Sequence, residues 1–262
     1  MCHIGILPCI ARNFSTTQDH CYIYLTMNFL NASNNIRIRY SDNGDQSGTP
    51  LILCHGLTAT LEMWRNQVHF FESKYRVITW DNRGHGSSSA PANADEYSTE
   101  IFANDLLNLI RNLNIQEKVI LGGMSFGGHT ALQFAYQFPG LTKALILSDT
   151  TTNTVPIDPD IPPEIYSSDP GINGCYLAMR QRPDLTMHLK ELEIPTLIIA
   201  GTDDPMIFPH LAHLTDNIPR RKLALMKSCF HGTSSQRPDT WNQLVSDFLD
   251  HLNNFENSEH VV

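Results

Sequence analysis

The sequence predicts one α/β domain built on a doubly wound, mostly parallel sheet, and three observations support this fold class. At 262 residues the chain fits a single large core. Hydrophobic residues make up 41% of the chain and charged residues 17%, which is enough apolar material to bury such a core. Short, continuously apolar runs alternate with longer stretches of helical periodicity. This alternation is typical of right-handed βαβ units.

The apolar runs are bounded by turn-forming residues, as expected for parallel strands that are buried on both faces. The runs that predict these strands are 51–54, 76–80, 118–122, 144–148, 195–200 and, more weakly, 222–226. Residues 36–40 instead alternate between apolar and polar side chains, which predicts a half-buried antiparallel strand at an edge of the sheet. The helical patterns occupy 61–74, 99–113, 126–138 and 239–255.

Three segments stand outside this alternation. Residues 1–26 are aperiodic and carry three of the cysteines, so we expect an N-terminal extension that is disordered or peripheral to the fold. Residues 150–194 are helical only near 174–181, which predicts a short cap inserted over the sheet. We therefore expect the main domain to span 27–255 and a C-terminal tail to cover 256–262.

Composition narrows the classes of partner. The formal net charge of −9, without a cluster of Lys and Arg, argues against binding to nucleic acid. The six cysteines show neither a zinc-ligand spacing nor a disulfide framework, so we expect buried free thiols in a reducing compartment. No signal peptide is evident, and no run approaches the roughly 20 apolar residues of a membrane-spanning helix. We expect a cytoplasmic protein with no metal and no membrane partner.

The strongest local motif is Gly-Met-Ser-Phe-Gly-Gly at residues 123–128, which lies between an apolar strand and a helix. Glycines two positions before and after Ser125 let the strand and the helix approach closely, so that the chain turns sharply and exposes the hydroxyl. The helix that follows directs its positive end towards the place where an oxyanion would form. These features predict Ser125 as a nucleophile.

Two further motifs follow predicted strands. His55-Gly56 comes directly after 51–54, and Asp-Asn-Arg-Gly-His-Gly-Ser occupies 81–87 directly after 76–80. With the serine motif they resemble the α/β-hydrolase fold family over about residues 35–255. The resemblance implies a serine hydrolase that needs no cofactor. The serine distinguishes the chain from epoxide hydrolases and haloalkane dehalogenases, which use aspartate at that position.

The resemblance also implies that an acid and then a histidine follow the nucleophile, on loops after successive late strands. Of the twelve histidines, His231 fits because it follows the run 222–226 and precedes the last helix. We therefore predict His231 as the general base. Asp204 follows the run 195–200 in the family's Gly-x-x-Asp pattern, and we predict that it orients His231. Asp203 in the same loop and Asp149 after the preceding strand remain alternatives.

The oxyanion donors implied by the resemblance are the main-chain N–H groups of Leu57 and Phe126. His55 is then expected to brace its loop, and the motif at 81–87 to shape a turn beside the site. Two features depart from the family. Phe230 precedes the base where relatives usually carry glycine, and the cap is shorter than in many relatives, which implies a more open site.

The function that this resemblance implies is hydrolysis of a small carboxylic ester or lactone through an acyl-enzyme on Ser125. Small esterases, enol-lactonases and carbon–carbon bond hydrolases carry the most similar motifs. Two alternatives therefore remain: a carbon–carbon bond hydrolase of ring-fission products, and a non-catalytic ligand-binding protein of the same fold. The identity of the substrate and the oligomeric state leave no signature in the sequence.

Overall fold

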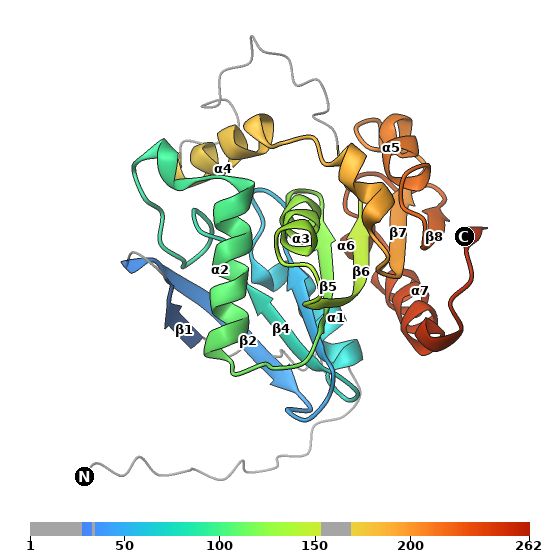
Figure 1. Cartoon of the computed structure of the whole chain (residues 1–262), viewed down its shortest axis with the longest axis horizontal. Coiled ribbons are helices and arrows are strands. Elements are labelled where there is room, and N and C mark those ends of the chain that lie inside the picture. Colours follow the sequence, from blue (N-terminus) through green and yellow to red (C-terminus); the bar gives the residue numbers. More distant parts are fainter. Residues whose placement is uncertain (1–27, 33–34, 153–168) are drawn as a thin grey trace, which may run out of the picture.

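The computed structural model of the chain describes residues 28–32, 35–152 and 169–262 (Figure 1). The expected extension 1–26 and the cap residues 153–168 lie outside the described residues. The described part holds a nine-stranded sheet in the order β1-β2-β4-β3-β5-β6-β7-β8-β9. Its strands are β1 (Asn28–Asn31), β2 (Arg37–Gly44), β3 (Pro50–Cys54), β4 (Arg76–Trp80), β5 (Val119–Met124), β6 (Thr142–Ser148), β7 (Thr196–Gly201), β8 (Arg221–Met226) and β9 (Ser258–Val261).

The α-helices of the described part connect or cover these strands. They are α1 (Arg65–Phe71), α2 (Thr99–Asn112), α3 (Phe126–Gln137), α4 (Pro170–Gln181), α5 (Ala212–Thr215), α6 (Thr233–Gln236) and α7 (Pro238–Asp250). The expected helix 61–74 begins as a 3-10 turn over Leu61–Trp64, and the expected helix 239–255 already ends at Asp250. No helix among the described residues has both the length and the apolar character needed to cross a bilayer.

The sheet is mostly parallel, as predicted. Strands β1 and β2 pair antiparallel, and every neighbouring pair from β4 to β9 is parallel. From the central strand β3 the chain first moves outward to β4 and then returns to β5 on the other side of β3. The strand order therefore reverses between β3 and β5. In open α/β sheets, ligands bind beyond the carboxyl ends of the strands at such a point.

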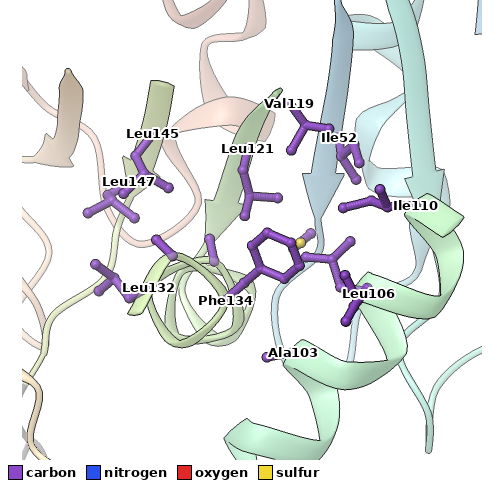
Figure 2. Packing of buried hydrophobic residues seen from close by; sticks show 14 of the residues in the cluster. Ile52, Ala103, Leu106, Ile110, Val119, Leu121, Leu132, Phe134, Leu145 and Leu147 are labelled. Atoms are coloured by element: carbon purple, nitrogen blue, oxygen red, sulfur yellow. The ribbon is translucent and has the colours of Figure 1, made fainter. Parts of the chain in front are cut away.

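Both faces of the central strands are buried, which is why these strands read as continuous apolar runs. On one face Ile52, Leu121 and Leu145 pack against α2 and α3 (Figure 2). Their neighbours in sequence point to the opposite face, where Leu51 and Ile120 pack in the cluster that includes α1 and α7. Each fully buried aliphatic side chain of this size contributes about 1.5–3 kcal/mol. The central strands are thus fixed in place by two apolar layers.

Two expectations about the sheet need correction. The strand predicted at 36–40 is antiparallel but does not lie at the edge, because β1 pairs outside it. Residues 256–262 are not a tail, because β9 extends the sheet beside β8 and Val262 N donates to Leu225 O at 2.8 Å. Both missed strands are four residues long, and Leu30 is the one side chain in them that is buried. Main-chain hydrogen bonds hold them to the sheet, and these leave no apolar pattern in the sequence.

Candidate active site

Ser125 lies on the sharp turn between β5 and α3. Its φ of 53° and ψ of −115° are rare for a residue with a side chain, so the surrounding contacts must hold this conformation. Ser125 N donates to Ser148 O at 2.9 Å, and Ser125 O accepts from Gly128 N and from Thr150 Oγ1, both at 2.9 Å. The turn is therefore bound to the end of β6 as well as to its own helix. The Ser125 side chain remains partly accessible.

Glycines on both sides of Ser125 allow contacts that no other residue would permit. A Cβ atom on Gly123 would lie 2.2 Å from Gly127 O. A Cβ atom on Gly127 would lie 2.1 Å from Cys54 O and 2.7 Å from His55 O. The start of α3 thus lies against the end of β5, as the glycine spacing predicted, and also against the end of β3. This contact brings Phe126, the first residue of α3, next to the loop that contains Leu57.

Two buried histidines hold the loop around Leu57. His55 Nδ1 donates to the carbonyl oxygen of Gly56 at 2.8 Å, and its Nε2 accepts from Asn82 N at 3.0 Å. His85 Nε2 accepts from Thr58 N at 3.2 Å. Burial lowers the pKa of His55 to about 4 and that of His85 to about 3. Both rings are therefore neutral near pH 7, the state in which Nε2 can accept a hydrogen bond.

The motif at 81–87 forms a buried turn that supports this loop. Asp81 Oδ1 accepts from Leu61 N at 2.8 Å, and Asp81 Oδ2 accepts from Ser87 N at 3.0 Å. Arg83 forms a buried, bidentate ion pair with Asp105, with distances of 2.6 and 2.7 Å. The motif at 81–87 therefore forms a turn beside this loop, as expected.

Helix α4, the described helix of the predicted cap, packs on the same turn. Cys175 Sγ donates to Arg83 O at 3.1 Å. A Cβ atom on Gly84 would lie 2.6 Å from Gly171 O, so the two segments approach to backbone contact. The described end of the predicted cap is thus anchored to the turn that supports the loop around Leu57.

His231 and Asp204 are paired on the loops after β8 and β7. His231 Nδ1 lies 2.8 Å from Asp204 Oδ2, and Asp204 Oδ1 accepts from Met206 N at 2.9 Å and from Ile207 N at 3.2 Å. The Asp204 side chain is fully buried, whereas 26% of the His231 side chain is exposed. Asp203 is exposed, and its carboxylate accepts from the neighbouring Thr202 hydroxyl. Of the two adjacent aspartates, only Asp204 therefore contacts the predicted base.

Asp149, the third candidate acid, accepts hydrogen bonds from residues other than His231. Its Oδ2 accepts from Thr233 N and Thr233 Oγ1, both at 2.8 Å, and its Oδ1 accepts from Gly201 N at 3.3 Å. Burial raises the pKa of Asp149, and the hydrogen bonds from Thr233 act in the opposite direction. Nothing in the sequence beyond its position after a strand indicated these contacts.

The loop of His231 accommodates Phe230 without strain. Phe230 points outward with 59% of its surface exposed, and the left-handed conformations of the loop fall on Ser228 and Gly232, with φ of 53° and 94°. Gln236 brackets the loop, since its Oε1 accepts from Phe230 N at 3.1 Å and its Nε2 donates to His231 O at 2.9 Å. Sequence reasoning missed Gln236, because a surface glutamine carries no motif. The departure at Phe230 therefore leaves the His231–Asp204 contact intact.

The nucleophile turn and the base loop also meet. A Cβ atom on Gly232, next to His231, would lie 3.7 Å from Cε of Met124, which precedes Ser125. The turn of Ser125 and the loop of His231 thus lie side by side beyond the carboxyl ends of β5 and β8, beside the reversal of strand order. Within the described residues, no group of three or more His, Cys, Asp and Glu side chains is placed to hold a metal ion.

The three cysteines of the described part, Cys54, Cys175 and Cys229, are buried and free. Burial raises the pKa of Cys54 to about 12, and it also raises the pKa of Cys175. Thiols of this kind are poor nucleophiles near neutral pH. The cysteines at positions 2, 9 and 21 lie outside the described residues.

A serine on a strand-to-helix turn at the switch point of a mostly parallel sheet is the arrangement of an α/β-class hydrolase. Comparison with known proteins agrees. A sequence model of the α/β-hydrolase fold matches residues 49–166. The 3-oxoadipate enol-lactonase 2 of Acinetobacter baylyi is 24% identical over 258 residues, which cover 83% of this chain and 95% of that protein.

Two further proteins resemble the chain over most of its length. The 2-hydroxy-6-oxo-6-(2'-aminophenyl)hexa-2,4-dienoic acid hydrolase of Metapseudomonas resinovorans is 25% identical over 283 residues, which cover 91% of this chain and 95% of that protein. A thermophilic esterase from Thermogutta terrifontis shares the fold with a TM-score of 0.76 and 24% identity, over 87% of this chain and 99% of that chain. The chain thus has the α/β-hydrolase fold, and its sequence is similar to members of that family over most of its length.

Proposed function

We propose that the protein is a serine hydrolase that cleaves a small carboxylic ester or lactone through an acyl-enzyme on Ser125. The observation that carries the proposal is the placement of a strained serine turn beside a histidine whose Nδ1 is bonded to a buried carboxylate. With Nδ1 facing Asp204, the Nε2 atom of His231 is the nitrogen left to take a proton from a hydroxyl.

In the proposed acylation step, Ser125 Oγ attacks the carbonyl carbon of the substrate while His231 Nε2 takes its proton. Asp204 keeps the proton on Nδ1 of the neutral ring and stabilises the imidazolium that forms. His231 then gives the proton to the leaving oxygen. The products of this step are an acyl-Ser125 ester and an alcohol, or a single ring-opened acyl-enzyme when the substrate is a lactone.

In this proposal, the main-chain N–H groups of Leu57 and Phe126 donate hydrogen bonds to the negatively charged oxygen of the tetrahedral intermediate and stabilise it. The amide of Phe126 is the first of a helix and has no partner within that helix, so it is available to an anion. The amide of Leu57 belongs to the loop that His55 and His85 hold. Water activated by His231 then hydrolyses the acyl-enzyme and restores Ser125.

The test is labelling of the full chain with a fluorophosphonate probe, followed by peptide mapping, together with turnover of a short aryl ester. We expect covalent modification at Ser125 and repeated turnover. A chain that folds but is not modified at Ser125 would disprove the serine mechanism. At most one slow round of ester cleavage would instead favour the non-catalytic ligand-binding alternative.

The second candidate is a carbon–carbon bond hydrolase that acts on a ring-fission diketo acid. The similarity to the hydrolase of Metapseudomonas resinovorans favours this candidate, because that relative is covered almost end to end. Comparing kcat/KM for a series of aryl esters with that for a ring-fission diketo acid separates the two reactions. Preference for the diketo acid would replace the ester or lactone assignment and leave the role of Ser125 intact.

A further inference from the structure

We infer that Asp149 is a positioning residue that sets the relative placement of Asp204 and His231. The inference rests on the proposed function and deepens it. Asp149 directly follows β6, which lies between β5 and β7 in the sheet. From this position its carboxylate binds the loop after β7 and the loop after β8.

The two carboxylate oxygens of Asp149 bind different loops. Oδ1 accepts from Gly201 N at 3.3 Å, three residues before Asp204. Oδ2 accepts from Thr233 N and Thr233 Oγ1, both at 2.8 Å, two residues after His231. The loop of the acid and the loop of the base are therefore attached to opposite oxygens of one carboxylate. A displacement of Asp149 would change the His231–Asp204 geometry, although no hydrogen bond joins Asp149 to either side chain.

The surroundings of Asp149 make this attachment rigid. Ser148 Oγ donates to Asp149 Oδ2 at 3.2 Å and accepts from Trp241 Nε1 at 3.1 Å. The side chains of Ser148, Asp149 and Thr233 are fully buried, and Trp241 is 1% exposed. Water cannot replace a lost hydrogen bond here without a rearrangement of the core, since the network is closed to solvent.

Only a carboxylate can fill this position. Four donors converge on Asp149: one main-chain N–H from Gly201, one from Thr233, and the hydroxyls of Thr233 and Ser148. A carboxylate offers about four acceptor sites on two oxygens, whereas the amide of asparagine has one acceptor oxygen and two donors. In Asp149→Asn the amide nitrogen would therefore face a main-chain N–H, at either Gly201 or Thr233.

The test compares Asp149→Asn with the wild type in ester hydrolysis over the whole pH range, normalised to the sites that a fluorophosphonate titrates. A positioning role lowers kcat on the alkaline plateau about 10²-fold, because a misplacement of about 1 Å in a catalytic group has an effect of this size. KM stays near its wild-type value. A role confined to stability lowers Tm and leaves the plateau unchanged, and a purely electrostatic role shifts the profile along the pH axis. Either of the last two results would overturn the inference.

A second set of variants covers the case in which Asp149→Asn does not fold. Thr233→Val removes one hydroxyl donor and keeps both the carboxylate of Asp149 and its bond to the main-chain N–H of residue 233. We expect kcat on the alkaline plateau to fall by a smaller factor, about tenfold. Thr233→Ser restores the hydroxyl and should restore the plateau. An unchanged plateau in Thr233→Val would count against the inference. A wild type that neither labels at Ser125 nor turns over would instead remove the proposed function, and this inference with it.

Discussion

The two halves of the candidate site use the same two kinds of contact, glycine packing and hydrogen bonds to the main chain, in different proportions. The nucleophile half, residues 55–58 and 123–128, depends on close backbone packing at glycines and on neutral, buried histidines. The acid–base half, residues 201–204 and 229–236, has one close glycine contact, at Gly201, and depends mainly on hydrogen bonds between side chains and main-chain groups. Packing at a glycine depends on which residue occupies one position, whereas the hydrogen bonds of Asp149 depend on partners 52 and 84 residues away in sequence. We therefore expect substitutions in the two halves to affect activity and stability differently.

Replacing the nucleophile should have the largest effect. Ser125→Ala removes the attacking oxygen and leaves the glycine contacts of the turn in place, so the fold should persist. We expect kcat for an aryl ester to fall on the order of 10⁶-fold. Circular dichroism and Tm report whether the variant folds, and a steady-state assay of aryl ester hydrolysis reports kcat. A decrease below about tenfold would place the nucleophile elsewhere.

The next largest effect is expected in the acid–base half. Asp204→Asn keeps the shape of the side chain but favours the wrong tautomer of His231, and we expect kcat to fall about 10⁴-fold. Asp203→Asn is the matched control, because Asp203 is adjacent and exposed. Its kcat should stay within about twofold of the wild type. The reverse order of effects would identify Asp203 as the acid.

The difference between the halves also explains how far the sequence could predict the site. The Gly-x-Ser-x-Gly spacing names the nucleophile half directly, since a side chain at Gly123 or Gly127 would clash with backbone atoms. The central strands were equally predictable from the sequence, because burial on both faces leaves uninterrupted apolar runs. In the acid–base half the sequence narrowed the acid to three aspartates, and the hydrogen bond from His231 to Asp204 distinguishes them.

The features that sequence reasoning missed share one physical property. Strands β1 and β9, the attachment through Asp149 and the bracket by Gln236 all depend on hydrogen bonds to main-chain groups. Every residue offers the same main-chain donor and acceptor, so such bonds carry no residue-type signature. They can be recognised only once the partners are placed in space.

Acid should weaken the nucleophile half through its two buried histidines. Burial lowers the pKa of His55 from 6.5 to about 4 and that of His85 from 6.5 to about 3. Below pH 6.5 the unfolded chain binds protons on these rings while the folded protein does not. Stability is therefore complete above that pH and decreases as the pH falls towards the folded pKa. Each ring should cost about 2 kcal/mol between pH 6.5 and about pH 5.

Urea unfolding at a series of pH values measures this dependence. The informative variant is His85→Gln, which removes one of the two titrating rings. The slope of unfolding free energy against pH should decrease by the contribution of one proton, about 1.4 kcal/mol per pH unit. His251→Gln is the control, because His251 is exposed at the end of α7. An identical slope in His85→Gln and the wild type would show that His85 does not contribute to the acid sensitivity.

The smallest effect is expected at Gln236, whose side-chain amide bonds to Phe230 N and His231 O. Because Gln236 is exposed, water can bond to these main-chain groups once the side chain is removed. Gln236→Ala should thus lower kcat only about fivefold, the equivalent of roughly 1 kcal/mol. Gln243→Ala is the matched control, since Gln243 is an exposed glutamine on α7 whose amide bonds to Asp247. If both variants kept the wild-type kcat, the buried attachment through Asp149 would be sufficient to hold the base, and the acid–base half would not need its exposed bracket.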